Sequence, residues 1–348
     1  MINDIENLQF LPSLLLPWFY SNNRKLPWRI NSDPYRVWVS EIMLQQTRVQ
    51  TVIDRYSHFL ESFPDVYSLA YCSEDRLLKE WEGLGYYNRA RNMRLTAQII
   101  VSQYGGVFPD DYDNLVRLPG IGPYTAGAIA SIAYNKKVPA VDGNVLRVLS
   151  RYIASNNDVK ELKTGNYFKE ILFHIIPNDA GSFAQALMDI GELVCIPNGV
   201  PQCDECPLNN HCIAHATHSE TKYPIRLNKS KRTIQEISIF VFWNNKKQYF
   251  LNKRSEEGLL GGLWEFPNIS YHFGDGDLKE TLSNEYGIET YSLRGKQSYK
   301  HIFSHFEWII NAYYIEVFDN SVQSFELAYE DEIDKHYPLP TAFKKLMK

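Results

Sequence analysis

Four of the five cysteines lie close together in the chain, and thiols grouped in this way can bind a metal. Their spacing is C-x7-C-x2-C-x5-C, at Cys195, Cys203, Cys206 and Cys212. Disulfide frameworks are typical of short secreted chains, so a cluster in a chain of 348 residues favours a metal site. Four thiolates suit a [4Fe–4S] cluster or structural zinc, and the spacing does not decide between them. Possible substitute ligands are His211, His215 and His218.

A glycine hairpin between two helical patterns could bind phosphate. Residues 114–134 contain Pro-Gly-x-Gly, with Gly120 and Gly122 at the turn. Glycines there allow a tight turn that directs backbone N–H groups outward at the start of the next helix, and these groups can hold a phosphate without Lys or Arg. A plain helix–helix turn is the alternative, because Gly-x-Gly is common.

Asp142 stands at the predicted start of a helix, within VDGNVLRV. A short side-chain acceptor at that position caps the helix, and Asn144 can form a second local hydrogen bond. From the sequence alone, the capping role is sufficient to explain Asp142.

The elements that must position these residues change in type along the chain. From residue 7 to 218, apolar residues recur at helical spacing. The predicted helices are 37–63, 68–81, 89–104, 142–153, 162–176 and 181–195. Beyond residue 218, segments rich in β-branched and aromatic residues predict strands at 236–243, 248–254, 300–303 and 308–318, with a short helix at 278–286.

We therefore predict a multidomain protein with an all-α domain followed by an α+β domain. The predicted boundaries are 1–218 for the helical domain, 219–233 for a polar, basic linker and 234–348 for the second domain. At about 150 residues per domain, the length agrees with two domains. Cys72, outside the cysteine cluster, is interpreted as a small buried apolar residue of a helix.

Composition and charge limit the class of protein. With 44% hydrophobic and 22% charged residues, the chain is neither disordered nor collagen-like. No apolar run approaches the roughly 18 residues of a membrane helix and no basic signal peptide is evident, so we expect a cytoplasmic protein, nucleoid-associated if bacterial. The net charge is −5, and neither part of the chain is a basic module. Nucleic-acid binding would depend on locally placed charge or on backbone amides.

Together these motifs resemble the helix-hairpin-helix DNA glycosylase superfamily with an iron–sulfur cluster, and within it the adenine DNA glycosylase (MutY) family. The matching segments span nearly the whole chain: LPWR (26–29), PYRVWVSEIMLQQTRV (34–49), WEGLGYYNRARN (81–92), LPGIGPYTAGAI (118–129), VDGNVLRV (141–148), FAQALMDIG (183–191) and HIFSHF (301–306). The resemblance implies a [4Fe–4S] cluster held by the four clustered cysteines. The first cysteine gap has seven residues where the family usually has six, which leaves the geometry of that loop open.

The resemblance also implies an activity: hydrolysis of the N-glycosidic bond of adenine mispaired with 8-oxoguanine or guanine in double-stranded DNA, by a monomer. Glu41 and Asp142 would supply the acid and a negative charge beside the sugar. Glu41 falls on an otherwise apolar helix face, where burial would raise its pKa as an acid catalyst requires. Tyr124 and Asn144 would orient the sugar and Asp142. Related endonuclease III-type enzymes have a lysine at the Tyr124 position, and because a phenol cannot form a Schiff base, monofunctional base removal is implied.

Further positions follow from the need to flip the base out of the duplex. Gln46 and Tyr86 match the wedge positions of the family, and Trp28, Arg29 and Gln185 match positions around the extruded adenine. Core packing is the alternative role for Trp28 and Tyr86.

The C-terminal part resembles a Nudix fold, most clearly in GLLGGLWEFP (258–267). Nudix hydrolases bind Mg²⁺ through a run of glutamates, of which residues 278–288 keep only Glu280 and Glu285, so a pyrophosphatase is not expected. In the family this domain recognises 8-oxoguanine, and the positions matching its recognition loop are Phe303, Ser304 and His305.

Two other functions compete with this interpretation. An endonuclease III-like oxidised-pyrimidine glycosylase with lyase activity is disfavoured by Tyr124 and by the added C-terminal domain. A non-catalytic lesion-binding iron–sulfur protein is disfavoured because both Glu41 and Asp142 are present.

Overall fold

The computed structural model describes residues 2–22, 24–227, 232–270, 277–303, 306–318 and 325–347. Its contacts define two compact units, one formed by Met1–Tyr71 with Asn92–Lys229 and the other by Cys72–Arg91 with Ser230–Lys348. Within the described ranges, no helix has the length and apolar character needed to cross a membrane.

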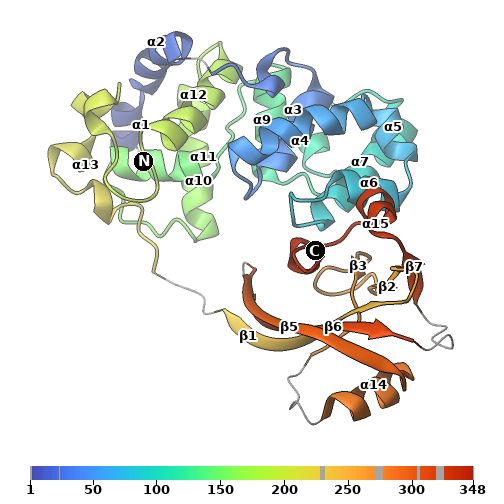
Figure 1. The fold of residues 1–348 in the computed structure, drawn as a ribbon. Coiled ribbons are helices and arrows are strands. Elements are labelled where there is room, and N and C mark those ends of the chain that lie inside the picture. The colour runs from blue at the N-terminus through green and yellow to red at the C-terminus, as the bar shows by residue number, and fades with distance from the viewer. Residues whose placement is uncertain are drawn as a thin grey trace. The chain divides into compact units, whose positions relative to one another are not determined.

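The first unit is helical (Figure 1). Its helices are α1 (Ile2–Leu8), α2 (Leu11–Asn22), α3 (Pro34–Leu44), α4 (Val49–Ser62), α5 (Val66–Tyr71), α7 (Asn88–Tyr104, which begins in the second unit), α8 (Tyr112–Leu115), α9 (Pro123–Ala128), α10 (Gly143–Tyr152), α11 (Leu162–Ile175), α12 (Ala180–Leu193) and α13 (Ile213–Ala216). A π-helical turn at Ile129–Ala133 follows α9, and a 3-10 turn at Pro27–Arg29 precedes α3.

One hydrophobic cluster of this unit forms where α10, α12 and α2 pack together. Each helix contributes apolar residues at three- and four-residue spacing, which places them on one face. The buried set includes Leu11, Leu15, Phe19, Val148, Leu149, Tyr152, Phe183, Leu187 and Ile190. Burial of each large side chain contributes roughly 1.5–3 kcal/mol, so α10 and α12 are firmly placed, and the side chains at their ends are fixed with them.

The prediction of one helix over residues 37–63 is wrong, because the chain forms α3 and α4 with a break between them. The amide of Gln45 bonds to the carbonyl of Ile42 at the end of α3, and Gln46 adopts a left-handed backbone with φ 56°. The apolar pattern continues across the break, so periodicity alone does not reveal it.

The helix predicted over residues 68–81 is also divided, into α5 and α6 (Glu74–Glu80). The side chain of Ser73 accepts a hydrogen bond from the amide of Arg76 and starts the second helix. Cys72 lies between the two helices and is buried.

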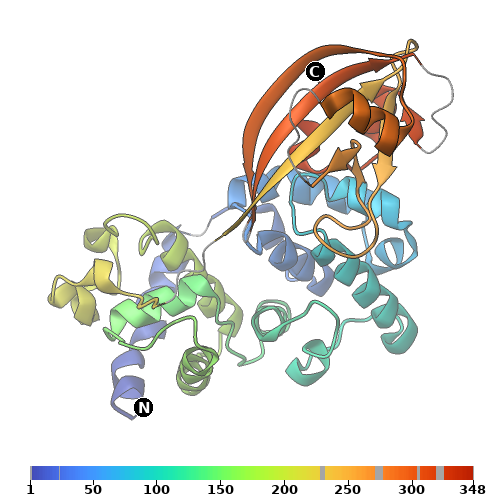
Figure 2. The same ribbon diagram turned by 90° about the horizontal axis from the view of Figure 1, so that it is seen from below.

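The second unit is built on a mixed sheet with the strand order β3-β2-β1-β6-β5; β4 pairs with β1, and β7 with β2. The strands are β1 (Thr233–Trp243), β2 (Tyr249–Lys253), β3 (Trp264–Glu265), β4 (Asn268–Ile269), β5 (Tyr291–Ile302), β6 (Phe306–Val317) and β7 (Glu326–Ala328). β1 and β6 are parallel along their length, whereas β5 and β6 form a long antiparallel pair (Figure 2). The predicted strand at 300–303 is thus the end of a much longer strand.

Both faces of this sheet are covered by helices, because alternate residues of β1 and β6 point to opposite sides. Phe240 and Phe242 pack with α14 (Leu278–Tyr286) on one face. Ile239 and Val241 pack on the other face with α15 (Glu330–His336) and α16 (Thr341–Lys344). The α+β prediction for this part of the chain is confirmed by this layered arrangement.

The segment Cys72–Arg91 belongs to this second unit, although in sequence it interrupts the helices of the first. α6 lies beside α15 (Figure 1). The buried carboxylate of Glu82 accepts hydrogen bonds from Lys79 (2.6 Å) and from Lys344 (2.7 Å) of α16. These ion pairs fasten the segment that carries Tyr86 to the C-terminal helices.

Candidate active site

A cleft of about 1140 Å³ in the first unit gathers most of the residues that the sequence singled out. Its walls come from α3, the hairpin before α9, the start of α10, and α12. The sequence-predicted residues that line it are Trp28, Arg29, Glu41, Gln46, Gly120, Gly122, Tyr124, Asp142, Asn144 and Gln185.

Glu41 is a buried acid on α3. Its side chain is only 5% exposed, and the hydroxyl of Tyr124 donates a hydrogen bond to its Oε2. Burial raises the pKa of Glu41 to about 7; the Asp142 charge acts in the same direction, while the Tyr124 bond and Arg29 oppose it. A carboxyl with this pKa can hold a proton near neutral pH and release it to a bound group.

Tyr124 is a neutral hydrogen-bond donor in this site. Burial and the nearby carboxylates of Glu41 and Asp142 raise its pKa well above the ordinary value. Its hydroxyl also lies 3.6 Å from the sulfur of Met188 on α12.

Asp142 caps α10, as the sequence predicts, and also faces the cleft. Oδ1 accepts the amide of Val145 (2.7 Å), and Oδ2 accepts the side-chain amide of Asn144 (2.8 Å). Burial raises the pKa of Asp142, and these two hydrogen bonds act against that rise because they favour the ionised form. The cap thus also fixes the direction in which the carboxylate points.

Asn144 is held in turn by Arg147, which sequence reasoning missed. The Arg147 guanidinium donates to Oδ1 of Asn144 (2.8 Å), to the carbonyl of Gly191 (2.6 Å) and to the carbonyl of Cys195 (2.8 Å). Gly191 must be small, because a Cβ there would lie 2.7 Å from the Cβ of Asn144. Asp142 is thus connected by hydrogen bonds to the first residue of the cysteine cluster.

The cleft is also lined by an aromatic side chain, Trp28, and by the charged pair of Arg29 and Asp189. Trp28 is 7% exposed and packs edge-on against Tyr56, so it has a core role as well as a place in the cleft. Arg29 forms a two-bond ion pair with Asp189, at 2.7 and 2.8 Å. Asp189 lies one helical turn after Gln185 on α12, so the i, i+4 spacing within FAQALMDIG could have indicated that the two share a face.

Of the two hairpin glycines, only Gly120 adopts a backbone conformation that favours glycine. Gly120 has φ 75°, and a Cβ there would meet Asn92 at 2.7 Å. Gly122 has extended backbone and open space beside it, at the start of α9. Both glycines are exposed and line the cleft.

The two residues expected at wedge positions share an unusual backbone. Gln46 and Tyr86 are exposed and have positive φ values of 56° and 47°. Gln46 belongs to the first unit and lines the cleft, whereas Tyr86 belongs to the second unit. The guanidinium of Arg89 lies 5.6 Å from the centre of the Tyr86 ring.

Of the three residues expected in the recognition loop, Phe303 is described, while Ser304 and His305 lie outside the described residues. The amide of Phe303 bonds to the carbonyl of Phe306 (2.8 Å), and its ring contacts His301 and Trp308 edge-on. Glu280 and Glu285 are exposed on α14.

The four clustered cysteines line one small apolar cavity. The guanidinium of Arg151 donates to the sulfur of Cys195 (3.2 Å). Burial raises the pKa of Cys206 to about 12 and, together with Glu220 and the other thiols, that of Cys203 to about 11. A bound cation would supply the positive charge needed to keep such thiols ionised.

The seven-residue gap is accommodated as an outward loop. The amide of Gln202 bonds to the carbonyl of Val194 (3.0 Å) and closes the loop at its base. Residues 197–200 are exposed, and Gly199 takes φ 80° at the turn. The extra residue therefore does not separate Cys195 from the other three cysteines.

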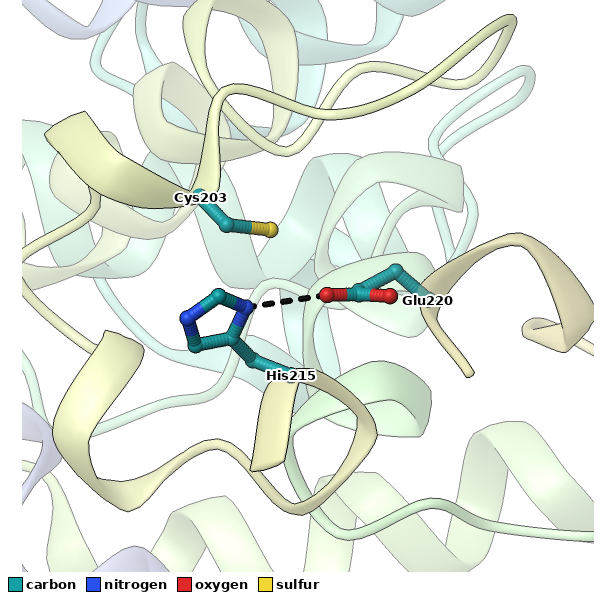
Figure 3. Close-up of side chains that lie close together, drawn as sticks. All are labelled: Cys203, His215 and Glu220. Atoms are coloured by element: carbon teal, nitrogen blue, oxygen red, sulfur yellow. Dashed lines mark hydrogen bonds and ion pairs between the residues drawn. The ribbon is translucent and has the colours of Figure 1, made fainter. Parts of the chain in front are cut away.

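One histidine of the three also approaches this cavity. The ligand atoms of Cys203, His215 and Glu220 lie within 4.8 Å of one another (Figure 3). Nδ1 of His215 is 2.9 Å from Oε1 of Glu220. His211 instead stacks on Phe10, at 5.2 Å between ring centres.

Comparison with known proteins agrees with this geometry. A family described as "HhH-GPD superfamily base excision DNA repair protein" matches residues 39–172, and one described as "NUDIX domain" matches residues 238–348. The adenine DNA glycosylase of Buchnera aphidicola subsp. Acyrthosiphon pisum is 38% identical over 344 residues, covering 96% of this chain and 95% of that protein. The Homo sapiens adenine DNA glycosylase is 30% identical over 372 residues, covering 90% of this chain and 68% of that protein.

The chain belongs to the adenine DNA glycosylase family. A solved structure of a thermostable thymine-DNA glycosylase is also similar, with TM-score 0.56 and 26% identity over 61% of this chain and 98% of that chain. The family and fold class predicted from the sequence, a helix-hairpin-helix domain followed by a Nudix-like domain, are thereby confirmed. As a member of the adenine DNA glycosylase family, the chain is a DNA-binding enzyme of base excision repair.

For this adenine DNA glycosylase family member, we expect the rate of base excision to fall as the pH rises through about 7, the pKa to which burial raises Glu41. Only the protonated carboxyl can give a proton to the base, so above that pH the rate constant should drop about tenfold per unit. Single-turnover rate constants measured from about pH 5.5 to 9 test this. A rate constant that stays level between about pH 6.5 and 8.5 contradicts the assignment.

Gly191→Ala should reduce excision, because its Cβ would displace Asn144 and, through it, Asp142. We also expect a loss of roughly 1–3 kcal/mol of stability from the clash. The matched control is Gly165→Ala on α11, where a Cβ meets nothing within 4 Å. Excision rate and Tm should be near parental in that control, and equal behaviour of the two variants would show that the contact is unimportant.

Proposed function

We propose that the chain removes adenine paired with 8-oxoguanine or guanine by hydrolysing its N-glycosidic bond, without cleaving the strand. The observation that carries the proposal is the buried Glu41 carboxyl, bonded to Tyr124 and close enough to Asp142 for the Asp142 charge to raise its pKa, in a cleft large enough for a flipped nucleotide. Breaking this bond needs a proton for the departing base and negative charge beside the sugar.

The two carboxyls have different surroundings, which suits two roles. Glu41 is buried and accepts one hydrogen bond from a neutral phenol, so its protonated form is favoured up to about pH 7. Asp142 accepts two bonds from N–H donors, which favour its charged form. Glu41 would protonate the base as it leaves, and Asp142 would face the positive charge that develops on the sugar.

The residues proposed to surround the base, Trp28, Arg29 and Gln185, line the cleft. The ion pair with Asp189 holds Arg29 rigidly, and Trp28 offers an apolar surface beside it. Gln185 donates weakly to the carbonyl of Gly181 (3.3 Å) and retains its oxygen for a ligand. Gln46 and Tyr86 would fill the space that the flipped base leaves.

Tyr124 supports base removal without strand cleavage. A lyase needs an amine that attacks the sugar carbon, and the group bonded to Glu41 here is a phenol whose pKa is raised well above its ordinary value. An endonuclease III-like lyase is therefore the less favoured function.

We further propose that Cys195, Cys203, Cys206 and Cys212 hold a [4Fe–4S] cluster. The donor set fits, since four thiols line one apolar cavity and Arg151 donates to a sulfur. The cluster would stabilise the cysteine loop. Arg147 connects that loop to the active site, because its guanidinium donates both to the carbonyl of Cys195 and to Oδ1 of Asn144.

Protein purified without oxygen should therefore contain about four irons per chain and be yellow-brown. Cys206→Ser should lose iron and the visible absorption. Cys72→Ala, which removes the cysteine outside the cavity, should keep both. One zinc per chain without visible absorption would contradict the iron–sulfur proposal and indicate a zinc site instead.

For the second unit, we propose that the β5–β6 loop contacts 8-oxoguanine through Ser304. The protein should release adenine from both A:8-oxoG and A:G duplexes, with strand breaks only after alkali treatment. Ser304→Ala should lower the ratio of the excision rate on the A:8-oxoG duplex to that on the A:G duplex, because one or two hydrogen bonds to a base contribute roughly 1–3 kcal/mol of discrimination.

Ser298→Ala is the matched control, since Ser298 lies within β5 and its hydroxyl donates to Oδ1 of Asn311 (2.7 Å). Its rate ratio should equal that of the parent protein. An unchanged rate ratio in Ser304→Ala would show that Ser304 does not recognise 8-oxoguanine. Strand breaks without alkali treatment would contradict base removal without strand cleavage.

A further inference from the structure

The arginines that line the cleft differ in whether their guanidinium groups have partners. Among the described residues, the arginines that line it are Arg24, Arg29, Arg48, Arg147 and Arg226. Arg24 and Arg29 pair with carboxylates of α12, and Arg147 bonds to carbonyl oxygens. The guanidinium groups of Arg48 and Arg226 form no hydrogen bond or ion pair with the residues that the structure describes, and both residues are exposed.

Arg226 comes from the segment that the sequence marks as a linker, yet the backbone around it is fixed. The guanidinium of Arg151 donates to the carbonyl of Tyr223 (3.1 Å). The amide of Val159 donates to the carbonyl of Ile225 (3.1 Å), and the amide of Leu227 donates to the carboxylate of Asp158 (3.2 Å). The residues on both sides of Arg226 are thus attached to the connection between α10 and α11.

Backbone amides, first that of Lys160, lower the pKa of Asp158, and the charge of Arg226 adds to that effect. Asp158 is 7% exposed, and its oxygens accept the amides of Lys160 (2.9 Å) and Leu227 (3.2 Å). The structure therefore holds the Arg226 backbone in place, while its guanidinium lines the cleft without a hydrogen bond or ion pair among the described residues.

We propose that Arg226 binds a phosphate of the DNA backbone at the edge of the active-site cleft. The inference rests on the proposed function, since a nucleotide flipped into this cleft brings its flanking phosphates to the rim. The chain has a net charge of −5 and buries two acids here, so a phosphate in this region needs a local cation. A guanidinium on a fixed backbone supplies that cation with little loss of main-chain freedom.

The test is the salt dependence of DNA binding. The probe is a duplex with 2′-fluoro-2′-deoxyadenosine opposite 8-oxoguanine, which resists hydrolysis, together with an undamaged duplex of the same length. Arg226→Ala should weaken binding to the duplex with 2′-fluoro-2′-deoxyadenosine more than binding to the undamaged duplex, because the contacted phosphate flanks the flipped nucleotide. The slope of log K against log salt should become shallower by about 0.9, the value for one phosphate. Arg226→Lys should retain most of the slope.

Lys222→Ala is the matched control. It removes the same charge four residues earlier, from an exposed side chain that does not line the cleft, and should keep the parental slope. A parental slope in Arg226→Ala, an equal change in Lys222→Ala, or the same loss in Arg226→Lys would each overturn the phosphate contact. Failure of the proposed function would be visible separately, as absence of adenine release by the parent protein from a cleavable duplex.

Discussion

The burial of the Glu41 carboxyl is the constraint on which the rest of the site depends. A carboxylate removed from water is costly, so a buried acid shifts its pKa or finds donors. Here it does both, since burial raises the pKa to about 7 and Tyr124 donates to it. The position of Tyr124 in turn depends on the hairpin turn before α9, which needs Gly120 because its φ is positive.

A second set of hydrogen bonds joins Asp142 to the cysteine loop. Asn144 donates to Asp142, Arg147 donates to Asn144, and the same guanidinium donates to the carbonyl of Cys195. Arg147 is buried, and burial lowers its pKa, while the Cys195 and Asp142 side chains act in the opposite direction. A change at the cysteine loop would therefore alter the orientation of the Asp142 carboxylate, although no cysteine lines the active-site cleft.

Sequence patterns predicted the parts of the structure that local rules control. Residues 278–286 form α14 with the predicted limits, because Gly287 takes a left-handed backbone and ends the helix. Asp142 caps α10 for the same kind of local reason. The break at Gln45 and Gln46 was not predicted, because apolar spacing continues through it. The bonds from Arg29 to Asp189 and from Arg147 to the Cys195 carbonyl were also not predicted, since each joins segments more than 40 residues apart.

Function was accessible from the sequence chiefly through the resemblance, since each motif has an ordinary structural explanation by itself. The cleft supplies what the motifs separately do not: it places Glu41, Tyr124 and Asp142 on one surface. The most direct test is Glu41→Gln, which keeps the shape of the side chain but has no proton to give. The account predicts that this variant binds an A:8-oxoG duplex with near-parental affinity and loses adenine excision by at least about a hundredfold. Near-parental excision in a folded Glu41→Gln protein would contradict it.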